Sequence, residues 1–382
     1  MSDLKKQPGF CYEIFKNQAF WSVKDTVGYS PCCFYDGYID TGVTPDQAWQ
    51  SPGHLELINK VTNGELIPGC VKCYKQEKNK LPSRRQASKD LYENHLNNDD
   101  VSKIDAPMAI DYSVGNLCNL KCTICSPTHS NKWISDWSKL YPTQNMDLFS
   151  YRKGQNITIE DLEYLKNIRF IHFHGGGDPL LSDEHIKLIQ KVEKVKGLHD
   201  VRISYNVNAT NRVTPEVLDL WSRCNLVELY FSIDDIGERF EYQRTGAKWQ
   251  KAIDTMYWFR DNMPVNHMFN INCVWGYLNL YYLDELYYWH QKNFSTNRLN
   301  DPVKLLFQKC LREYSLDHIN ENAIQVLKRK FDNIPEILSL VNTLEVNNDD
   351  HNTFWNIVKR TDSIRETNFE KLCPEWAALL DV

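Results

Sequence analysis

The chain has 382 residues, of which 42% are hydrophobic and 25% charged, with a formal net charge of −6 at pH 7 and a mean hydropathy of −0.53. This length suits one large domain or two ordinary ones around a buried core. The acidic balance lacks the basic footprint of a nucleic-acid-binding protein. Because no run of eighteen or more apolar residues and no secretory signal is visible, we expect a cytoplasmic protein without a membrane partner.

The twelve cysteines therefore need an explanation other than disulfides. The cytosol keeps thiols reduced, so clustered cysteines there more often bind metal or carry out redox chemistry. The amino-terminal group consists of Cys11, Cys32, Cys33, Cys70 and Cys73. One tight cluster follows, made of Cys118, Cys122 and Cys125. The remaining four are isolated: Cys224, Cys273, Cys310 and Cys373.

The first 85 residues have frequent turn signals and one predicted helix, at 55–63, so we expect a small irregular domain there. Residues 86–106 are polar and rich in charge, and we interpret them as a linker. A regular alternation of apolar runs and amphipathic helical patterns follows. The predicted strands are 108–114, 168–173, 201–207, 226–233, 268–274 and 303–307, and the predicted helices between them are 182–196, 214–223, 249–262 and 280–292.

This alternation predicts an α/β fold with a parallel sheet, namely a partial (β/α)6 barrel over residues 107–310. A full eight-stranded barrel would need more chain. Residues 311–382 are predicted to form a helical carboxyl-terminal extension. In such folds the functional residues lie at the carboxyl ends of the strands.

A tight cysteine loop, Cys118, Cys122 and Cys125, follows the first predicted strand of this barrel. Three thiolates can bind one face of a four-iron cluster and leave its fourth iron open, whereas iron–sulfur electron carriers supply four cysteines. The alternative is a zinc site, which would need a fourth ligand such as His129 or His174.

The CxxxCxxC spacing resembles the signature of the radical S-adenosylmethionine (SAM) superfamily, over about residues 107–307. The resemblance implies a [4Fe–4S] cluster on Cys118, Cys122 and Cys125, with SAM chelated to the open iron. One departure is Ile124, where many members carry an aromatic residue.

Other strand ends are similar to the SAM-binding motifs of that superfamily. The segment Gly175, Gly176, Gly177, Asp178 resembles Gly-Gly-Glu-Pro, which holds the methionine amino group, although the acid here is one methylene shorter. The resemblance also implies a ribose contact for Asn208 and an adenine-side position for Asn272. A Ser-x-Asp…Arg pattern for the methionine carboxylate is matched by Ser232, Asp234 and Arg244. Each match also has a simpler explanation when it is taken singly. The glycine and asparagine segments could be ordinary turns, and the arginine could be a solvated surface charge.

The amino-terminal cysteines resemble the Twitch or SPASM module, which holds an auxiliary cluster. The implied ligands are Cys11, Cys33, Cys70 and Cys73, with Cys32 as the alternative to Cys33. The first gap is slightly long, and the usual module follows the barrel instead of preceding it. A structural zinc ribbon is the alternative, because four sulfur ligands suit zinc as well as iron.

The resemblance implies an enzyme that reductively cleaves SAM and abstracts hydrogen from a substrate, with a flavodoxin or ferredoxin as electron donor. We expect a peptide or protein substrate; a small molecule acted on by a dehydrogenase or cyclase is the alternative. Cys310, just after the sixth strand, is a candidate hydrogen donor, although a packing role is the simpler interpretation. A degenerate cluster-binding interaction protein is the alternative from another class.

Overall fold

The computed structural model describes residues 4–23, 26–78, 82–93, 101, 103, 105–113, 115–149, 158–174, 176–264, 267–296, 302–310, 312–316, 318–346 and 352–380. The chain divides into two compact units. The first comprises Met1–Leu117, Ser150–Tyr205 and Thr214–Val227, and the second comprises Cys118–Phe149, Asn206–Val213 and Glu228–Val382.

The fold is a mixed α/β structure whose main sheet is mostly parallel, as the sequence predicts. Nine strands follow the order β3-β2-β1-β4-β5-β6-β7-β8-β9, and a separate two-stranded sheet pairs β10 with β11. Six of the nine coincide with the predicted strands and follow the near-continuous apolar runs. They are β4 (Ala109–Tyr112), β5 (Phe170–Phe173), β6 (Arg202–Val207), β7 (Leu226–Ser232), β8 (Met268–Trp275) and β9 (Leu305–Lys309).

The amino-terminal segment differs from the irregular domain that the sequence predicts, because it adds three strands to the main sheet. These are β1 (Asn17–Val23), β2 (Thr26–Ser30) and β3 (Asp40–Thr41). Strand β1 pairs in parallel with β4, with Gln18 opposite Ile110, and antiparallel with β2. Strand β1 begins with buried polar residues, Asn17 and Gln18, so no apolar run marks it in the sequence. The boundaries 1–85, 86–106, 107–310 and 311–382 stay a prediction.

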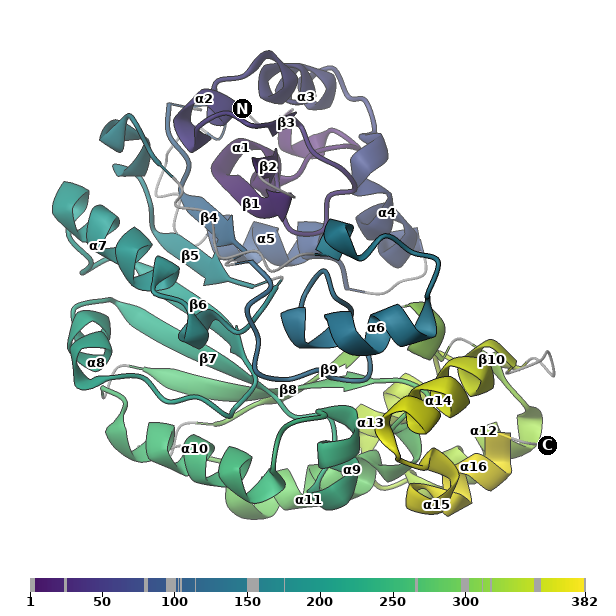
Figure 1. The fold of residues 1–382 in the computed structure, drawn as a ribbon. Coiled ribbons are helices and arrows are strands. Elements are labelled where there is room, and N and C mark those ends of the chain that lie inside the picture. Colours follow the sequence, from purple (N-terminus) through teal and green to yellow (C-terminus); the bar gives the residue numbers. More distant parts are fainter. Residues whose placement is uncertain are drawn as a thin grey trace. The chain divides into compact units, whose positions relative to one another are not determined.

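In the first unit, short helices gather around β1 to β3 (Figure 1). Local signals explain where they begin: Thr44 and Gln47 form a capping box at α2, and Ser51 caps α3 ahead of Pro52. A core cluster that includes Phe15, Tyr92 and Phe170 joins these helices to the sheet. The helices of this unit are α1 (Tyr12–Lys16), α2 (Pro45–Trp49), α3 (Pro52–Thr62), α4 (Val71–Lys78), α5 (Arg84–Glu93), α7 (Glu184–Lys196) and α8 (Pro215–Ser222), with 3-10 helices η1 (Leu4–Lys6), η2 (Pro68–Cys70), η5 (Leu162–Leu165) and η6 (Pro179–Leu181).

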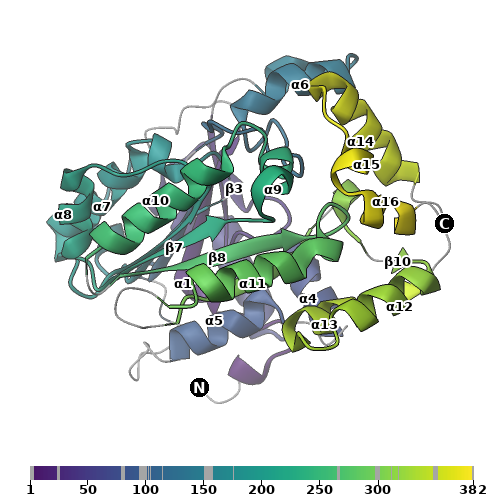
Figure 2. The ribbon, with the colours of Figure 1, turned by 90° about the horizontal axis from the view of Figure 1, so that it is seen from below.

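In the second unit, the carboxyl-terminal segment is helical, as predicted, and α14 runs beside α6 (Figure 2). The helices here are α6 (Ile134–Leu140), α9 (Gly237–Gln243), α10 (Trp249–Asn262), α11 (Leu283–Asn293), α12 (Glu321–Lys330), α13 (Pro335–Val341), α14 (Asn352–Arg365), α15 (Phe369–Leu372) and α16 (Pro374–Leu380). The remaining elements are η3 (Asn131–Trp133), η4 (Met146–Phe149), η7 (Leu280–Tyr282), η8 (Arg312–Tyr314), β10 (His318–Ile319) and β11 (Glu345–Val346). Across the described ranges, no helix combines the length and hydrophobicity needed to span a membrane.

Candidate metal and cofactor sites

The loop of Cys118, Cys122 and Cys125 is irregular, and the end of α9 with the residues after it holds the loop by its backbone. The backbone N–H of Lys121 donates to the Thr245 carbonyl at 2.9 Å, and that of Thr123 donates to the Gln243 carbonyl at 2.7 Å. These bonds satisfy the loop's polar backbone without regular secondary structure. The Cys118 and Cys122 side chains are buried and that of Cys125 is half-buried.

The residues just after the loop fold back and cap it. Asn131 Oδ1 accepts a hydrogen bond from the Cys118 N–H at 3.0 Å. Trp133 Nε1 donates to the Cys122 carbonyl at 2.7 Å, and Ser130 Oγ donates to the Leu120 carbonyl at 2.5 Å. Each bond uses a side chain on a backbone group, so the loop's shape depends on these three residue types.

Arg365, the last residue of α14, completes the support of the loop. Its guanidinium donates to the Lys121 carbonyl at 2.9 Å and to Thr123 Oγ1 at 3.1 Å, and Nε donates to Asp136 at 2.9 Å. The same group lies 4.3 Å from the ring centroid of Trp133. The sequence did not point to this residue, because a lone arginine at a helix end looks like a solvated surface charge.

Two donors approach the loop sulfurs from neighbouring elements. Arg244 Nη1 lies 3.7 Å from Cys122 Sγ, and Asn208 Nδ2 lies 3.9 Å from Cys118 Sγ. Burial raises the pKa of the Cys122 thiol, and the Arg244 charge opposes that rise. Burial also raises the pKa of Cys125 to about 12, and the neighbouring Cys122 adds to the rise. Thiolate ligands here therefore need positive charge nearby, whether from Arg244 or from metal.

The loop sulfurs are not gathered as closely as the ligands of a single zinc ion. Two sulfur ligands of one zinc lie about 3.8 Å apart, because each Zn–S bond is about 2.3 Å. Among the described residues, one set of three potential ligand atoms lies within 4.8 Å of one another, and it consists of Cys33, Asp111 and His174. The three loop cysteines are not such a set, so at least one pair of their sulfurs lies more than 4.8 Å apart.

Arg244 and Asp234, both predicted to contact SAM, are paired with each other. Arg244 Nε lies 2.7 Å from Asp234 Oδ2, and both side chains are buried. Asp234 Oδ1 also accepts the Val274 N–H at 2.9 Å, which ties the end of β7 to β8. Asp234 therefore orients Arg244 in this structure, and a direct SAM contact for Asp234 stays a prediction.

Strands β7 and β8 each bring one polar residue to the same end of the sheet. Ser232 pairs in register with Asn272, and both are predicted site residues. The Oδ1 of buried Asn272 and the Oγ of buried Ser126 have no hydrogen-bond partner within the described part of the chain. A buried acceptor without a donor is costly, so these atoms fit a site that a polar ligand completes.

Asn208, predicted to reach the ribose, anchors a polar cluster after β6. Its Nδ2 donates to Asn119 Oδ1 at 2.8 Å, and its Oδ1 accepts from the Thr210 N–H at 3.0 Å. The intervening Ala209 has a φ of 60°, a left-handed conformation that costs a non-glycine residue about 1 kcal/mol or more. The strand end is thus held in a strained turn beside Cys118. Asn119 is a member of this cluster that was not predicted from the sequence.

The glycine segment belongs to the first unit and sits against the chain that leads into the cysteine loop. Gly175 lies outside the described residues. Gly177 has a φ of +63°, and any side chain there would overlap the Leu117 carbonyl, which also accepts the Asp178 N–H at 2.8 Å. Asp178 is buried, and its Oδ1 accepts from the Leu180 N–H at 3.0 Å. A side chain on Gly176 would likewise overlap the Gly115 carbonyl.

The amino-terminal cysteines are also in the first unit, and the adjacent Cys32 and Cys33 have different neighbours. Burial raises the pKa of Cys11 to about 12, with Glu13 and Cys70 adding to the rise. Burial likewise raises the pKa of Cys32, and the nearby charges include that of Cys11. Burial of Cys70 raises its pKa to about 11, and Cys73 contributes. Cys11 is therefore electrostatically linked to Cys32 and Cys70, and Cys70 to Cys73. Cys32 is also linked to Cys33, whose backbone N–H donates to Asp111.

Cys310 follows β9 and is buried, and its N–H donates to the Trp275 carbonyl at 2.7 Å. A β-carbon on Gly276 would come within 2.9 Å of Cys310 Cβ, so the two backbones are closely packed. The hydrogen-donor role of Cys310 stays a prediction.

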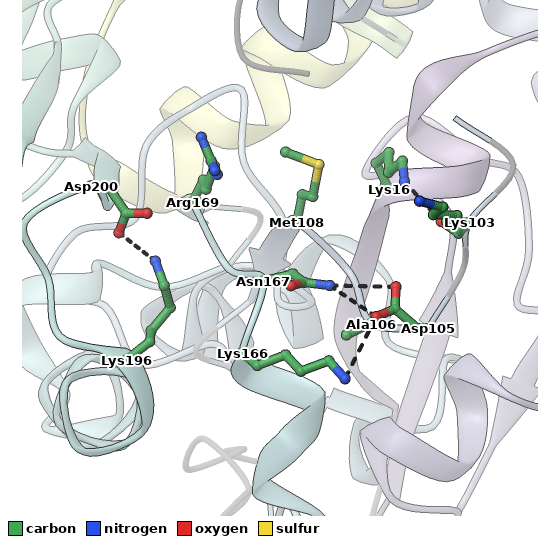
Figure 3. A pocket seen from close by; sticks show the side chains of 10 residues that line it. All are labelled: Lys16, Lys103, Asp105, Ala106, Met108, Lys166, Asn167, Arg169, Lys196 and Asp200. Atoms are coloured by element: carbon green, nitrogen blue, oxygen red, sulfur yellow. Dashed lines mark hydrogen bonds and ion pairs between the residues drawn. The ribbon is translucent and has the colours of Figure 1, made fainter. Parts of the chain in front are cut away.

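A cavity of about 290 Å³ lies at the opposite end of the strands of the first unit, near the start of β4 and β5 (Figure 3). Most of its charged groups are already paired: Lys166 lies 3.5 Å from Asp105, Lys196 pairs with Asp200, and Lys16 donates to the Lys103 carbonyl at 2.8 Å. Because functional sites in this type of fold lie at the carboxyl ends of strands, we interpret this cavity as structural.

One comparison with known families bears on the cysteine loop. Residues 112–277 match the model of the Radical SAM superfamily. This part of the chain, less than half of its length, is therefore similar to the radical SAM superfamily. SAM and a [4Fe–4S] cluster are the cofactors that this family implies, and the matched range contains all three loop cysteines together with Arg244 and Asn272.

Three solved structures show more distant similarity. A tagged form of anSMEcpe with bound AdoMet is 19% identical, with 63% of this chain and 61% of that chain covered and a TM-score of 0.41. Streptococcus suis SuiB bound to precursor peptide SuiA is 9% identical, with 85% and 60% covered and a TM-score of 0.38. TYW1 with a lysine-pyruvate adduct bound is 14% identical, with 59% and 74% covered and a TM-score of 0.33. The matched region thus spans about 60% of the length of the first two structures.

Proposed function

We propose that this chain is a radical SAM enzyme that binds a [4Fe–4S] cluster through Cys118, Cys122 and Cys125 and uses it to generate a substrate radical. When bound, the cluster and SAM supply the chemistry: one electron cleaves the sulfonium C–S bond to give methionine and a 5′-deoxyadenosyl radical, which removes a hydrogen atom from the substrate. The observation that carries the proposal is the loop itself, which gathers three cysteines beside the donors of Arg244 and Asn208.

The chain's own residues position and shield that chemistry. Arg244, held by Asp234, would pair with the methionine carboxylate while remaining near Cys122. Asn272 Oδ1 and Ser126 Oγ are buried acceptors that polar groups of SAM would satisfy. Asn208 would contact the ribose, and Ser232 would join Arg244 at the methionine carboxylate. Asp178 and the backbone of Gly175–Gly177 would hold the methionine amino group.

The amino-terminal set would hold an auxiliary cluster. Its ligands would be Cys11, Cys70 and Cys73, with Cys33 or Cys32 as the fourth. The proximity of Cys11, Cys32 and Cys70 supports this assignment. Such a cluster supplies an electron acceptor for a substrate radical or a ligand for the substrate. The resemblance to auxiliary-cluster modules supports a peptide or protein substrate, and an electron donor of the flavodoxin or ferredoxin type.

The test is anaerobic reconstitution of the full chain, followed by reduction with dithionite in the presence of SAM. We expect 5′-deoxyadenosine and methionine in equal amounts, and about eight irons per chain, four for each of two clusters. The Cys125→Ser variant is the control, because it removes one loop ligand and leaves the amino-terminal cysteines intact. No 5′-deoxyadenosine from a fully iron-loaded chain would identify a degenerate cluster-binding protein instead.

The substrate class needs a separate measurement. We expect peptides to raise 5′-deoxyadenosine formation above the rate without substrate and to change mass after reaction. A rise with small molecules alone, and none with peptide pools, would contradict the peptide proposal and leave SAM cleavage standing.

A further inference from the structure

Strands β4 and β5 bring three side chains of the first unit onto one face of the sheet. Asp111 of β4 is opposite His172 of β5 in register. The backbone N–H of His174 donates to the Tyr112 carbonyl at 3.0 Å and extends this pairing beyond β5. Alternate residues of a strand share a face, so His172 and His174 lie together with Asp111. The intervening Phe173 packs on the other side, 5.8 Å from the ring of His185 in α7.

Cys33 reaches the same place from the turn after β2. Its backbone N–H donates to Asp111 Oδ2 at 3.2 Å, and Cys33 Sγ, an Asp111 oxygen and a His174 ring nitrogen all lie within 4.8 Å of one another. The ligand atoms of a tetrahedral zinc ion lie about 3.3–3.8 Å apart, given bonds of about 2.0–2.3 Å. Small side-chain rotations would therefore close the set around one ion.

The preceding residue, Cys32, does not belong to this set. Its carbonyl accepts the Tyr35 N–H at 3.2 Å, and the next residue along this turn, Asp36, donates from its backbone to the Gly69 carbonyl at 2.9 Å. That turn packs Tyr35 against Gly69, directly before Cys70, so closely that a side chain on Gly69 would overlap the ring. The adjacent cysteines thus differ in their surroundings: the turn that carries Cys32 packs on Gly69, and Cys33 lies beside Asp111.

The charged groups around Asp111 are compatible with a bound cation. Arg84 Nε donates to Glu13 at 2.7 Å, and Arg84 Nη2 lies 3.4 Å from Asp111. Two buried carboxylates thus share one guanidinium, and His172 Nδ1 lies 3.4 Å from Asp111 Oδ1. A divalent ion would balance the charge of a Cys33 thiolate at this position. Nearby, Asn17 Nδ2 donates to Asp111 Oδ2 at 3.1 Å, while its buried Oδ1 has no hydrogen-bond partner within the described part of the chain.

We propose that Cys33, Asp111 and His174 bind one divalent transition-metal ion, separate from the auxiliary set, in which Cys32 then takes the fourth place. Zinc matches this mixture of sulfur, oxygen and nitrogen ligands. Three protein ligands leave a fourth position open for water or for a polar group of the substrate. His174 directly precedes the glycine segment assigned to SAM, so the metal would anchor a substrate beside the cofactor segment.

The experiment measures zinc and iron together in the reconstituted full chain, after free metal has been removed with a chelator. We expect about one zinc per chain in addition to the iron. Cys33→Ser and His174→Gln should each lower bound zinc at least fivefold and leave iron unchanged. Cys32→Ser is the matched control at the adjacent position, and it should lose about four irons and keep zinc.

A second measurement needs no variant, so it still tests the proposal if the variants fail to fold. Zinc X-ray absorption on the unaltered chain should show one sulfur and two or three nitrogen or oxygen neighbours. A four-sulfur shell would overturn the proposal, as would less than about one tenth of a zinc per chain. Iron loss in Cys33→Ser with none in Cys32→Ser would overturn it equally. Absence of SAM cleavage leaves the zinc result unaffected, so failure of the proposed function is distinguishable.

Discussion

Arg365 Nη2 donates a hydrogen bond to the Lys121 carbonyl at 2.9 Å, across 244 residues of chain. Its Nε bonds to Asp136, and both of these side chains are only 3% exposed. A residue of the carboxyl-terminal extension is thus part of the support for the cysteine loop. The extension contributes to the support of this loop, in addition to packing.

Arg365→Ala should weaken both stability and iron binding. Removing one partner of a buried, hydrogen-bonded ion pair costs about 3 kcal/mol, and here it also frees the Lys121 carbonyl. We expect a loss of that size in the free energy of unfolding, measured with urea, and fewer irons per chain after reconstitution. Arg365→Lys should fall between, because lysine lacks the planar fork. The control is Lys359→Ala on the same helix, whose exposed ion pair with Glu370 should be worth at most about 1 kcal/mol.

Arg244→Gln should move cluster assembly to higher pH. Burial raises the pKa of Cys122 and Arg244 opposes that rise, so removing the guanidinium leaves a smaller thiolate fraction at any given pH. We expect the pH of half-maximal iron incorporation to rise by about one unit, measured as iron per chain against reconstitution pH. Arg239→Gln is the control, because Arg239 pairs with Asp235 and Glu285 instead of a loop sulfur. An unchanged midpoint in Arg244→Gln would contradict the role given to this charge.

Gly177→Ala should disturb the entry to the cysteine loop. An alanine at a φ of +63° costs about 1 kcal/mol, and its β-carbon would also overlap the Leu117 carbonyl, which adds about 1–3 kcal/mol of overpacking. We expect lower stability and weaker SAM binding, measured by urea unfolding and calorimetry. Gly197→Ala is the matched control, since its φ is +81° but its nearest neighbour would be 3.6 Å away. Equal effects of the two changes would show that the close approach to Leu117 is unimportant.

His185 should make the protein less stable in mild acid. Burial lowers the pKa of this histidine to about 4, from an ordinary value near 6.5. Between these values the unfolded chain binds the proton and the folded chain does not, so stability falls as the pH drops. For this group alone we expect the free energy of unfolding to be about 2 kcal/mol lower at pH 5 than at pH 7. His185→Gln should remove that difference, measured by urea unfolding, whereas Lys187→Ala on the same helix should keep it.

Strands β4 to β9 were predictable because runs rich in apolar residues alternate with helical patterns along this part of the chain. The first three strands were not, because β1 begins with Asn17 and Gln18 and β3 has two residues. Burial of those polar groups depends on partners far along the chain, such as Asp111 for Asn17. Local patterns do not contain such partners.

The candidate site residues also fall into those that the sequence could predict and those that it could not. Spacing was sufficient to find Cys118, Cys122 and Cys125, because one loop supplies them all. Spacing did not separate Cys32 from Cys33, since adjacent residues differ only in the direction of their side chains. Asp111, His172 and His174 lie within or beside strands β4 and β5, so nothing in their sequence positions groups them. Strand register brings them together.

The support of the loop by Arg365 has a consequence for how the protein matures. During synthesis, the three cysteines leave the ribosome long before the residue that fixes their loop. A nascent chain therefore carries the cysteine loop without this support until Arg365 has been made. A fragment cut at residue 277, where the family match ends, would retain Cys118, Cys122 and Cys125 without the arginine that supports their loop.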